Sequence, residues 1–496
     1  MNEEIVKHII NSTRYILPEI IITCGILVLI LINVLSKSRK YSLYAFFTIL
    51  TLIAASIATF TLFSLPENYA YFGMIAVDKF SLFFKLFFIL STLLLALISM
   101  DSKELLEHSP AEYHVLMLSM LIGMNLLASG NNLLMIYLAF EMLSTAAYVL
   151  TGYLKQKKDS LEASLKYVIY GAMSSGIMLF GFTYLYGLTG DLRITIIKET
   201  LKNSPIPQPF ILFVMILILA GIGFKISSAP FHFWAPDVYE GAPTAITAHL
   251  SVASKAAGFA ILIRLFFSAF SYQIPDGIMV QTGAPWISLI AFLAVLSMTI
   301  GNVAALLQKN IKRMLAYSGI AQAGYMIMGL VTMNNEGISA VLFYLASYLI
   351  MNLGAFYIAI SLYPLTGSYA IDSYAGLWKK KPFAVIAMTF FMLSLIGIPP
   401  FIGFFSKFML FAAVIRAGWV WLAVVAVLNS VVSLYYYMYV IKVMVVDAPV
   451  KTETVAMPKF VYATALVLAV LSLIFGPGFQ PIYDFAKYSV QLIGLR

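Results

Sequence analysis

The chain has 496 residues, of which 61% are apolar and only 11% are charged. Soluble domains carry roughly 25% charged residues, so this composition, with a mean hydropathy of +0.93, excludes a soluble fold and indicates a membrane protein. In a membrane protein, the basic residues behind a formal charge of +9 indicate which loops lie on the cytoplasmic side, and they do not indicate nucleic-acid binding.

The single cysteine, Cys24, excludes an intramolecular disulfide and an iron–sulfur cluster held by cysteines alone. No two of the five histidines share one helix at the spacing of metal ligands. We therefore expect this chain to bind no metal and no redox cofactor.

Continuous apolar runs recur along the chain, each with the roughly 20 residues that a helix needs to cross a bilayer. They predict an all-α polytopic membrane protein, because the strands of a β-barrel leave shorter, alternating segments. We expect about 14 transmembrane helices. Their ranges are 16–36, 42–64, 78–100, 112–129, 132–153, 164–187, 209–230, 241–268, 286–307, 314–332, 337–363, 383–411, 418–441 and 459–477. The longest connections, 188–208 and 364–382, each have room for a short surface helix.

Basic residues gather in the connections that follow odd-numbered spans. They include Lys37, Arg39, Lys40, Lys155, Lys157, Lys158, Lys309, Lys312, Arg313, Lys379, Lys380, Lys381, Lys442 and Lys451. Because Lys and Arg are retained on the cytoplasmic side, these connections are predicted inside and both termini outside. The connection 101–112 is an exception to this pattern, since it is net acidic on the predicted inner side.

Four ionisable residues stand at mid-span, where a charge is costly and is a functional candidate by default. They are Glu141, Lys225, Lys255 and Lys407. Burial disfavours the ionised form of Glu141, and a neighbouring cation would favour it. Lys225 comes shortly before Pro230, which must break the seventh helix. A lysine beside such a break is the pattern of an intramembrane ion site.

Lys255 lies in the eighth span among small residues that let helices approach closely. His249, six residues earlier, is a candidate proton relay that a water molecule would link to Lys255. The twelfth span repeats the pattern of the seventh, because Pro399 and Pro400 interrupt it and Lys407 follows. Among the remaining charges, we expect Lys85 to snorkel. Lys166 begins the sixth span, and Glu162 and Asp237 are expected at the membrane interface.

Two broken helices five spans apart indicate two repeated units, spans four to eight and spans nine to thirteen. Because five is odd, the second unit is inverted in the membrane relative to the first. The expected organisation is a three-helix N-terminal segment (1–110), a first repeat (111–270), a second, inverted repeat (285–443), and a C-terminal helix and tail (444–496).

The stretch from about 212 to 330 contains DVYEGAPT at 237–244 and NVAALLQKNIKRMLAYSGIAQAGYMIMG at 302–329. It resembles the antiporter-like subunits of respiratory complex I, a family that also includes subunits of multi-subunit cation/proton antiporters and of membrane hydrogenases. DVYEGAPT is similar to the N-type branch, whereas the M- and L-types usually show a PDAH-like sequence there. The chain lacks the long lateral helix of the L-type, and Lys407 replaces the glutamate of the M-type.

The resemblance implies roles for the buried charges. Glu141 matches the fifth-helix glutamate that pairs with Lys225, Lys255 matches the central lysine of the eighth helix, and Lys407 matches the terminal lysine of the twelfth. The tenth span offers no deep charge, so water must bridge more of the path there. Its polar residues are Tyr317, Ser318, Gln322 and Tyr325, and the first three are expected to form a secondary proton path with His249.

The function implied is proton translocation, as a subunit of a complex I-type NADH-quinone oxidoreductase, a translocase of the bacterial inner membrane. FMN, iron–sulfur clusters and quinone would then belong to partner subunits, with M-, K-, J- and L-type subunits as membrane neighbours. We expect no nucleic acid and no small organic substrate on this chain. The alternatives are a subunit of a cation/proton antiporter or membrane hydrogenase. A structural scaffold fits less well, because two independent breaks each lie near a lysine.

Overall fold

The computed structural model describes residues 2–36, 40–106, 109–203, 206–273, 279–282, 285–449 and 457–490. The all-α polytopic prediction is confirmed, since two short antiparallel hairpins hold the only named strands of the described residues. Twelve helices of this part of the chain are long and apolar enough to cross a membrane. The count of about 14 stays a prediction, because two further apolar helices, Pro382–Ile396 and Lys459–Ile474, are shorter.

The N-terminal segment packs three membrane helices beside the rest of the protein. Its elements are α1 (Asn2–Thr13), η1 (Arg14–Ile16), α2 (Leu17–Leu35), α3 (Tyr41–Leu62), β1 (Asn68–Ala70), β2 (Ile75–Val77), α4 (Lys79–Ser99) and α5 (Lys103–Leu106). The snorkelling predicted for Lys85 is wrong. Its side chain is 1% exposed, and its ammonium lies 3.0 Å from the carboxylate of Glu19 on α2. The reason is that α3 packs on α4 and that Glu19 of α2 reaches Lys85, so the ammonium meets a carboxylate inside the protein.

The next segment contains the first broken helix. Its elements are α6 (Pro110–Ser129), α7 (Leu133–Thr151), α8 (Lys158–Thr189), α9 (Ile194–Asn203), α10 (Gln208–Ile226), α11 (Trp234–Gly241), α12 (Thr244–His249), the π-helical turn η2 (Leu250–Ser254), α13 (Lys255–Ala269), β3 (Ser271–Gln273) and β4 (Met279–Gln281). The surface helix expected within 188–208 is α9, whose Ile194, Ile197 and Leu201 are buried.

The following segment contains the second broken helix and leads to the C-terminal helices. Its elements are α14 (Trp286–Ala305), α15 (Ile311–Met328), η3 (Gly329–Thr332), α16 (Asn335–Thr366), η4 (Ile371–Tyr374), η5 (Leu377–Lys379), α17 (Pro382–Ile396), α18 (Ile402–Arg416), α19 (Val420–Val445), α20 (Lys459–Ile474) and α21 (Gln480–Ser489). The connection 364–382 holds η4 and η5 rather than an α-helix.

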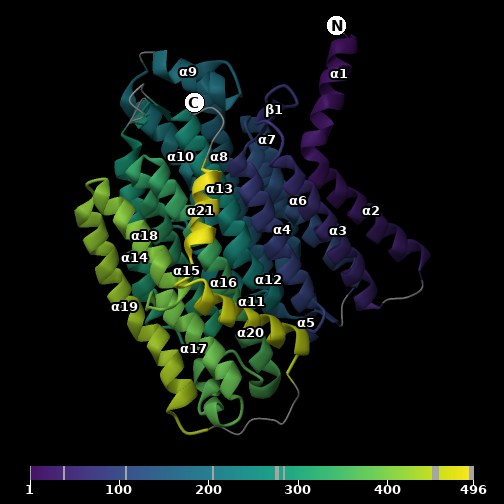
Figure 1. Cartoon of the computed structure of the whole chain (residues 1–496), viewed down its shortest axis with the longest axis vertical. Helices are drawn as coiled ribbons and strands as arrows, with labels where there is room; N and C mark the ends of the chain where they lie inside the picture. Colours follow the sequence, from purple (N-terminus) through teal and green to yellow (C-terminus); the bar gives the residue numbers. More distant parts are fainter. Residues whose placement is uncertain are drawn as a thin grey trace.

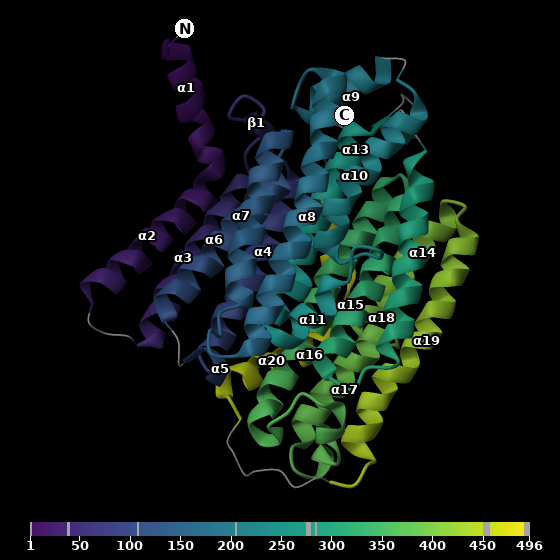
Figure 2. The same cartoon turned by 180° about the vertical axis from the view of Figure 1, so that it is seen from behind.

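The long helices lie side by side, with α9 and β1 at one end of the molecule and α5 at the other (Figures 1 and 2). The runs 244–269, 311–332 and 335–366 are buried almost throughout. Polar residues on these runs therefore face protein rather than lipid, and they form the interior in which the candidate site lies.

The two predicted repeats begin and end corresponding helices with the same kinds of caps and turns. Asn132 and Asn310 each cap a helix, with Oδ1 accepting the N–H of the residue two positions on at 2.9 and 2.8 Å. Both asparagines also make an antiparallel bridge to the segment after a 32-residue helix. Those helices, α8 and α16, end before Gly190 and Gly367, which have positive φ.

The sequences at these two ends are alike as well. YGLTGDLRI at 186–194 and YPLTGSYAI at 363–371 share the Tyr, Leu, Thr, Gly and Ile. The broken helices α10 and α17 likewise end before Ser227 and Gly397, at φ values of 58° and 91°, with Pro230 and Pro400 three residues on. These matched devices support the internal repeat predicted from the positions of the breaks.

Candidate functional site

The first buried lysine lies at the first helix break. Lys225 is fully buried in the last turn of α10, and its Nζ donates a hydrogen bond of 2.8 Å to Ser144 Oγ on α7. The ammonium lies 5.0 Å from the centre of the Phe140 ring. Glu141 Oε1 is buried and accepts no hydrogen bond in the described part of the chain. The direct partner of Lys225 is therefore Ser144, one turn beyond the glutamate that the resemblance implied.

The break itself is closed by backbone hydrogen bonds. Ser227 takes a left-handed conformation, its N–H donates to Phe224 O at 3.0 Å, and the N–H of Ser228 donates to Gly223 O at 2.9 Å. These bonds satisfy carbonyls that helix termination leaves free. Pro230 follows and cannot continue the ladder, so the chain turns away and leaves Lys225 at the end of α10.

Lys255 follows directly on the π-helical turn η2. Its Nζ is buried and donates no hydrogen bond to any described residue, and it lies 5.8 Å from the centre of the Tyr239 ring. The hydroxyls of Tyr239 and Tyr348 are likewise buried without a partner among the described residues. Single π-turns are frequent at functional sites, and this one directly precedes the only lysine in helix 244–269.

His249 makes no direct hydrogen bond to Lys255, and the link through water stays a prediction. His249 Nδ1 lies 3.2 Å from Ser91 Oγ on α4, and its Nε2 has no hydrogen-bond partner in the described structure. The π-turn between the two residues shifts the register of the helix, and His249 faces the N-terminal segment. The sequence separation gave no sign of this.

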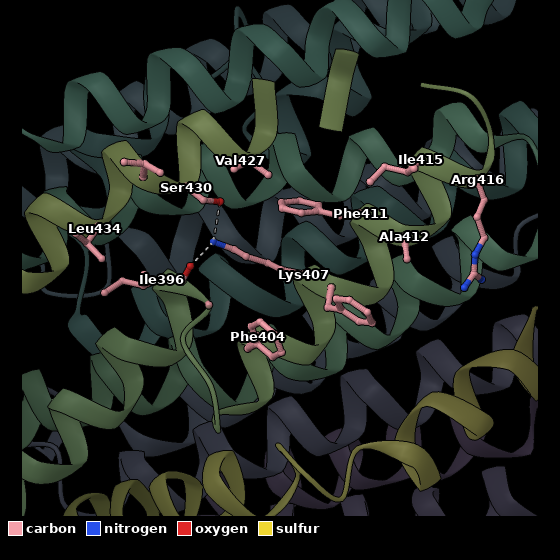
Figure 3. A pocket seen from close by; sticks show the side chains of 13 residues that line it. Ile396, Phe404, Lys407, Phe411, Ala412, Ile415, Arg416, Val427, Ser430 and Leu434 are labelled. Carbon is pink, nitrogen blue, oxygen red and sulfur yellow. Dashed lines mark hydrogen bonds between the residues drawn. The ribbon is translucent and has the colours of Figure 1, made fainter. Parts of the chain in front are cut away.

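Lys407 lies on α18, the second half of the broken helix, and its side chain caps the C-terminal end of α17, the first half. Its Nζ donates to Leu395 O at 3.1 Å, to Ile396 O at 2.9 Å and to Ser430 Oγ at 3.4 Å. Figure 3 shows the ammonium held between the end of α17 and Ser430 of α19. The ammonium also lies 4.7 Å from the centre of the Tyr325 ring. A cation there meets the negative end of the α17 dipole.

The Lys407 side chain borders a groove between α18 and α19 (Figure 3). The groove has a volume of about 670 Å³ and is lined mainly by apolar side chains. Arg416, ion-paired with Glu336, lies at its far end. Lys407 is therefore the most laterally placed of the three lysines.

A chain of hydrogen bonds approaches Lys407 from the interior. Tyr344 Oη donates to Gln322 Oε1, and Gln322 Nε2 donates to Leu395 O and to Tyr437 Oη, each at 3.2 Å. Ser318 Oγ and Tyr437 Oη are also hydrogen-bonded. Leu395 O thus accepts from both Gln322 and Lys407, and the two predicted residues Ser318 and Gln322 belong to one network.

Tyr317 lies outside this network. Its side chain is half-buried, and its phenol makes no hydrogen bond within the described residues. The tyrosines that sequence reasoning missed are Tyr344 and Tyr348 on α16 and Tyr437 on α19. The signal was present, because Tyr344 and Tyr348 are four residues apart and so share one face of an apolar span.

The DVYEGAPT segment is fixed by charges from two other parts of the chain. Lys312 on α15 is 2% exposed, and its Nζ donates to Glu240 O at 2.7 Å and to Ala242 O at 2.8 Å at the end of α11. Glu104 Oε2 accepts the N–H of Thr244 at 2.9 Å at the start of α12. Each charge suits the helix end it meets. The acidic connection 101–112, which is the exception to the charge pattern, thus has a structural role.

Asp237 joins the two halves at the same end of the molecule. It accepts hydrogen bonds of 2.7 Å from Lys166 on α8 and from Arg313 on α15. Lys166 also pairs with Glu162, and Arg313 with Glu240. These residues line a polar cavity of about 350 Å³. Glu162 and Asp237 are partly exposed, as expected of charges at a membrane interface.

The described residues hold no group of three or more His, Cys, Asp or Glu side chains that could bind a metal. The site consists instead of three buried lysines, one glutamate and a set of tyrosine, serine and glutamine side chains. Groups of this kind can hold and pass protons.

Comparison with known proteins gives a consistent result. Residues 130–433 match the family model described as NADH:quinone oxidoreductase/Mrp antiporter, TM. The chain is 42% identical to NADH-quinone oxidoreductase subunit N of Chlorobium chlorochromatii, over 100% of this chain and 98% of the relative. It is 42% identical to the chloroplastic NAD(P)H-quinone oxidoreductase subunit 2 of Mesostigma viride, over 87% and 84%.

Solved structures agree with the sequence relatives. A chain of respiratory complex I from Thermus thermophilus is similar with a TM-score of 0.79 and 31% identity, over 95% of this chain and 100% of that chain. A chain of the Mrp complex from Dietzia has a TM-score of 0.82 at 20% identity, over 96% and 97%. The second likeness concerns the fold alone.

Proposed function

This chain belongs to the NADH:quinone oxidoreductase/Mrp antiporter family of membrane proteins, and we propose that it translocates protons as a subunit of an NADH-quinone oxidoreductase. The observation that supports this proposal is the row of three buried lysines, Lys225, Lys255 and Lys407. Its relatives at about 40% identity over their full length are named subunit N of that enzyme. It acts among other membrane subunits, as the chain of complex I that it resembles does.

The proposed proton path runs from Glu141 through Lys225 and Lys255 to Lys407. A lysine suits this work because, unlike arginine, it can lose its proton when burial disfavours the charge. Ser144 holds the ammonium of Lys225. The helix of Lys255 packs close to Lys225, since a Cβ added at Gly258 would lie 3.3 Å from Lys225 Cβ.

Beyond Lys255, the hydrogen bonds of Tyr344, Gln322 and Tyr437 lead to Leu395 O, which Lys407 also contacts. Protonation of one lysine changes the electric field at the next lysine. A charge change introduced at one end of the row therefore alters proton binding along all of it. His249 and Tyr317 make no direct hydrogen bond to this network, so in the proposed path they take part only through water molecules.

The energy for pumping enters from partner subunits. Each charge that crosses the membrane works against about 2.3 kcal/mol per 100 mV, and a chain with one cysteine offers no ligand set for an iron–sulfur cluster. FMN, clusters and quinone therefore belong to other chains. The proposed membrane neighbours are subunits of the M-, K-, J- and L-types, and the membrane is the bacterial inner membrane.

The alternative is a subunit of a cation/proton antiporter. The family model covers both kinds of protein, and the Mrp chain from Dietzia shares the fold. That chain is only 20% identical, whereas full-length relatives of the oxidoreductase reach 42%. The oxidoreductase is therefore the better supported assignment.

The function is tested by replacing Lys225. Lys225→Met removes a protonatable group and keeps most of its length, so we expect proton pumping in membrane vesicles to fall by on the order of a hundredfold or more. Lys85→Met is the matched control, because it removes another buried lysine that lies outside this row. This control should lower the amount of assembled complex and leave pumping per complex intact. Normal pumping by Lys225→Met would refute the proposed path.

We propose further that both termini face the outside of the cell. The basic connections support this orientation, because Lys and Arg resist translocation. Epitope tags at either terminus should be reached by antibody in intact spheroplasts, whereas a tag inserted next to Lys380 should be reached only after lysis. A terminal tag that is protected in intact spheroplasts would contradict the orientation.

A further inference from the structure

The ammonium of Lys255 and the hydroxyl of Tyr348 meet above a glycine. A Cβ added at Gly319 on α15 would lie 2.7 Å from Lys255 Nζ and 3.0 Å from Tyr348 Oη. The two polar atoms are therefore less than 6 Å apart, a gap that one water molecule bridges. Both are buried, and neither has a hydrogen-bond partner among the described residues.

Gly319 also occupies the position in the second repeat that Glu141 occupies in the first. It is nine residues after the helix cap Asn310, and Glu141 is nine residues after the matching cap Asn132. Three residues further on, Ser144 and Gln322 match in the same way. Each of them makes a hydrogen bond to the residue two positions before the left-handed turn of a broken helix, Lys225 in one case and Leu395 in the other.

The first unit thus has a carboxylate, Glu141, at this position, one turn before the serine that binds Lys225, and the second unit has no side chain there. A carboxylate near an ammonium favours the charged form and would hold the proton on the lysine. Without it, Lys255 is free to pass its proton on. Any side chain at 319 would also occupy the space in which the ammonium faces Tyr348.

We propose that Gly319 is a positioning residue of the proton path and that Tyr348 is the group that receives the proton from Lys255. The ammonium gives one proton to the Tyr348 oxygen, directly or through one water, while the phenol releases its own proton, which ends on the neutral amine of Lys407 and makes it the ammonium. Lys255 becomes neutral, and Tyr348 ends as the neutral phenol that it was. Tyr344, one turn away on α16, continues the path to Gln322. This inference rests on the proposed function.

The test is Gly319→Ala, measured together with Tyr348→Phe. The nearest atoms to the new methyl group are the ends of two flexible side chains, and the next is Lys255 Cε at 3.9 Å, so the helix can accept alanine. A reacting group misplaced by about 1 Å costs on the order of a hundredfold in rate, and we expect a loss of that order in pumping by Gly319→Ala. Assembly on native gels should be unchanged.

Two readouts separate positioning from a structural defect. The solvent deuterium isotope effect on quinone reduction should rise in both variants, because proton transfer becomes rate-limiting, whereas partial misassembly would leave it unchanged. The double variant should pump no worse than Tyr348→Phe alone, since both changes break one link. Gly176→Ala is the control for replacing a glycine inside a helix: no described neighbour lies within 4 Å of its new methyl group, and pumping should stay normal.

Lys255→Met distinguishes the failure of this inference from that of the function. If Lys255→Met pumps normally, the proposed function fails. If Lys255→Met is inactive while Gly319→Ala pumps normally with an unchanged isotope effect, only the role of Gly319 is refuted. If Tyr348→Phe alone pumps normally, Tyr348 is not the acceptor.

Discussion

Lys407→Arg and Lys407→Met are both expected to lose proton pumping, although one keeps the positive charge and the other removes it. Arginine cannot release its proton at any accessible pH, and methionine never carries one. A group that must alternate between the two forms fails with either replacement. A loss on the order of a hundredfold or more is expected for a missing proton-transfer group. Proton uptake by vesicles measures it, with assembly checked on native gels.

The two variants also separate proton transfer from the other roles that the geometry permits. If Lys407 serves only as a counter-charge for the carbonyls of Leu395 and Ile396, Arg should pump and Met should not. If it serves only packing, Met should be the gentler change. Arg416→Gln is the control, because Arg416 lines the same groove at its far end and lies outside the path. It should pump normally.

Arg264→Leu is expected to prevent stable assembly of the protein. Arg264 on α13 is 1% exposed and donates to both carboxylate oxygens of Asp78, at 2.8 and 3.0 Å, and to Ala128 O at 2.9 Å. Loss of the guanidinium leaves the carboxylate buried without its counter-charge, which costs about 3–5 kcal/mol. The amount of protein in the membrane and its thermal stability in detergent should both fall.

The structural nature of this pair has its own control. Asp78 also caps α4 through the N–H of Ser81, and Asn at this position would still accept that bond without the charge. The double variant Arg264→Leu/Asp78→Asn should therefore recover part of the lost protein. Protons pumped per electron should stay normal in whatever Arg264→Leu complex assembles. Normal amounts of a complex that does not pump would instead place the pair in the proton path.

Several partners of the buried charges could not be predicted from the sequence. Lys225 is bonded to Ser144 and His249 contacts Ser91, two partners that the sequence did not indicate. Lys85 was expected to snorkel and is buried with Glu19. Each choice depends on how a helix is rotated and on which distant helix covers it. A single residue inserted by a π-turn moves a side chain by about 100° around the axis.

Composition and local pattern were enough to predict the membrane-spanning class, the two broken helices at Pro230 and at Pro399–Pro400, and the four charged residues that lipid would not tolerate. These are local properties, because the cost of burying a charge or of placing a proline in a helix is set at that residue. The groups that meet in space depend on helix packing: Ser144 with Lys225, Gly319 and Tyr348 with Lys255, Leu395 with Lys407. Hydrogen bonds act over about 3 Å, and that precision comes from the packing of helices far apart in the sequence.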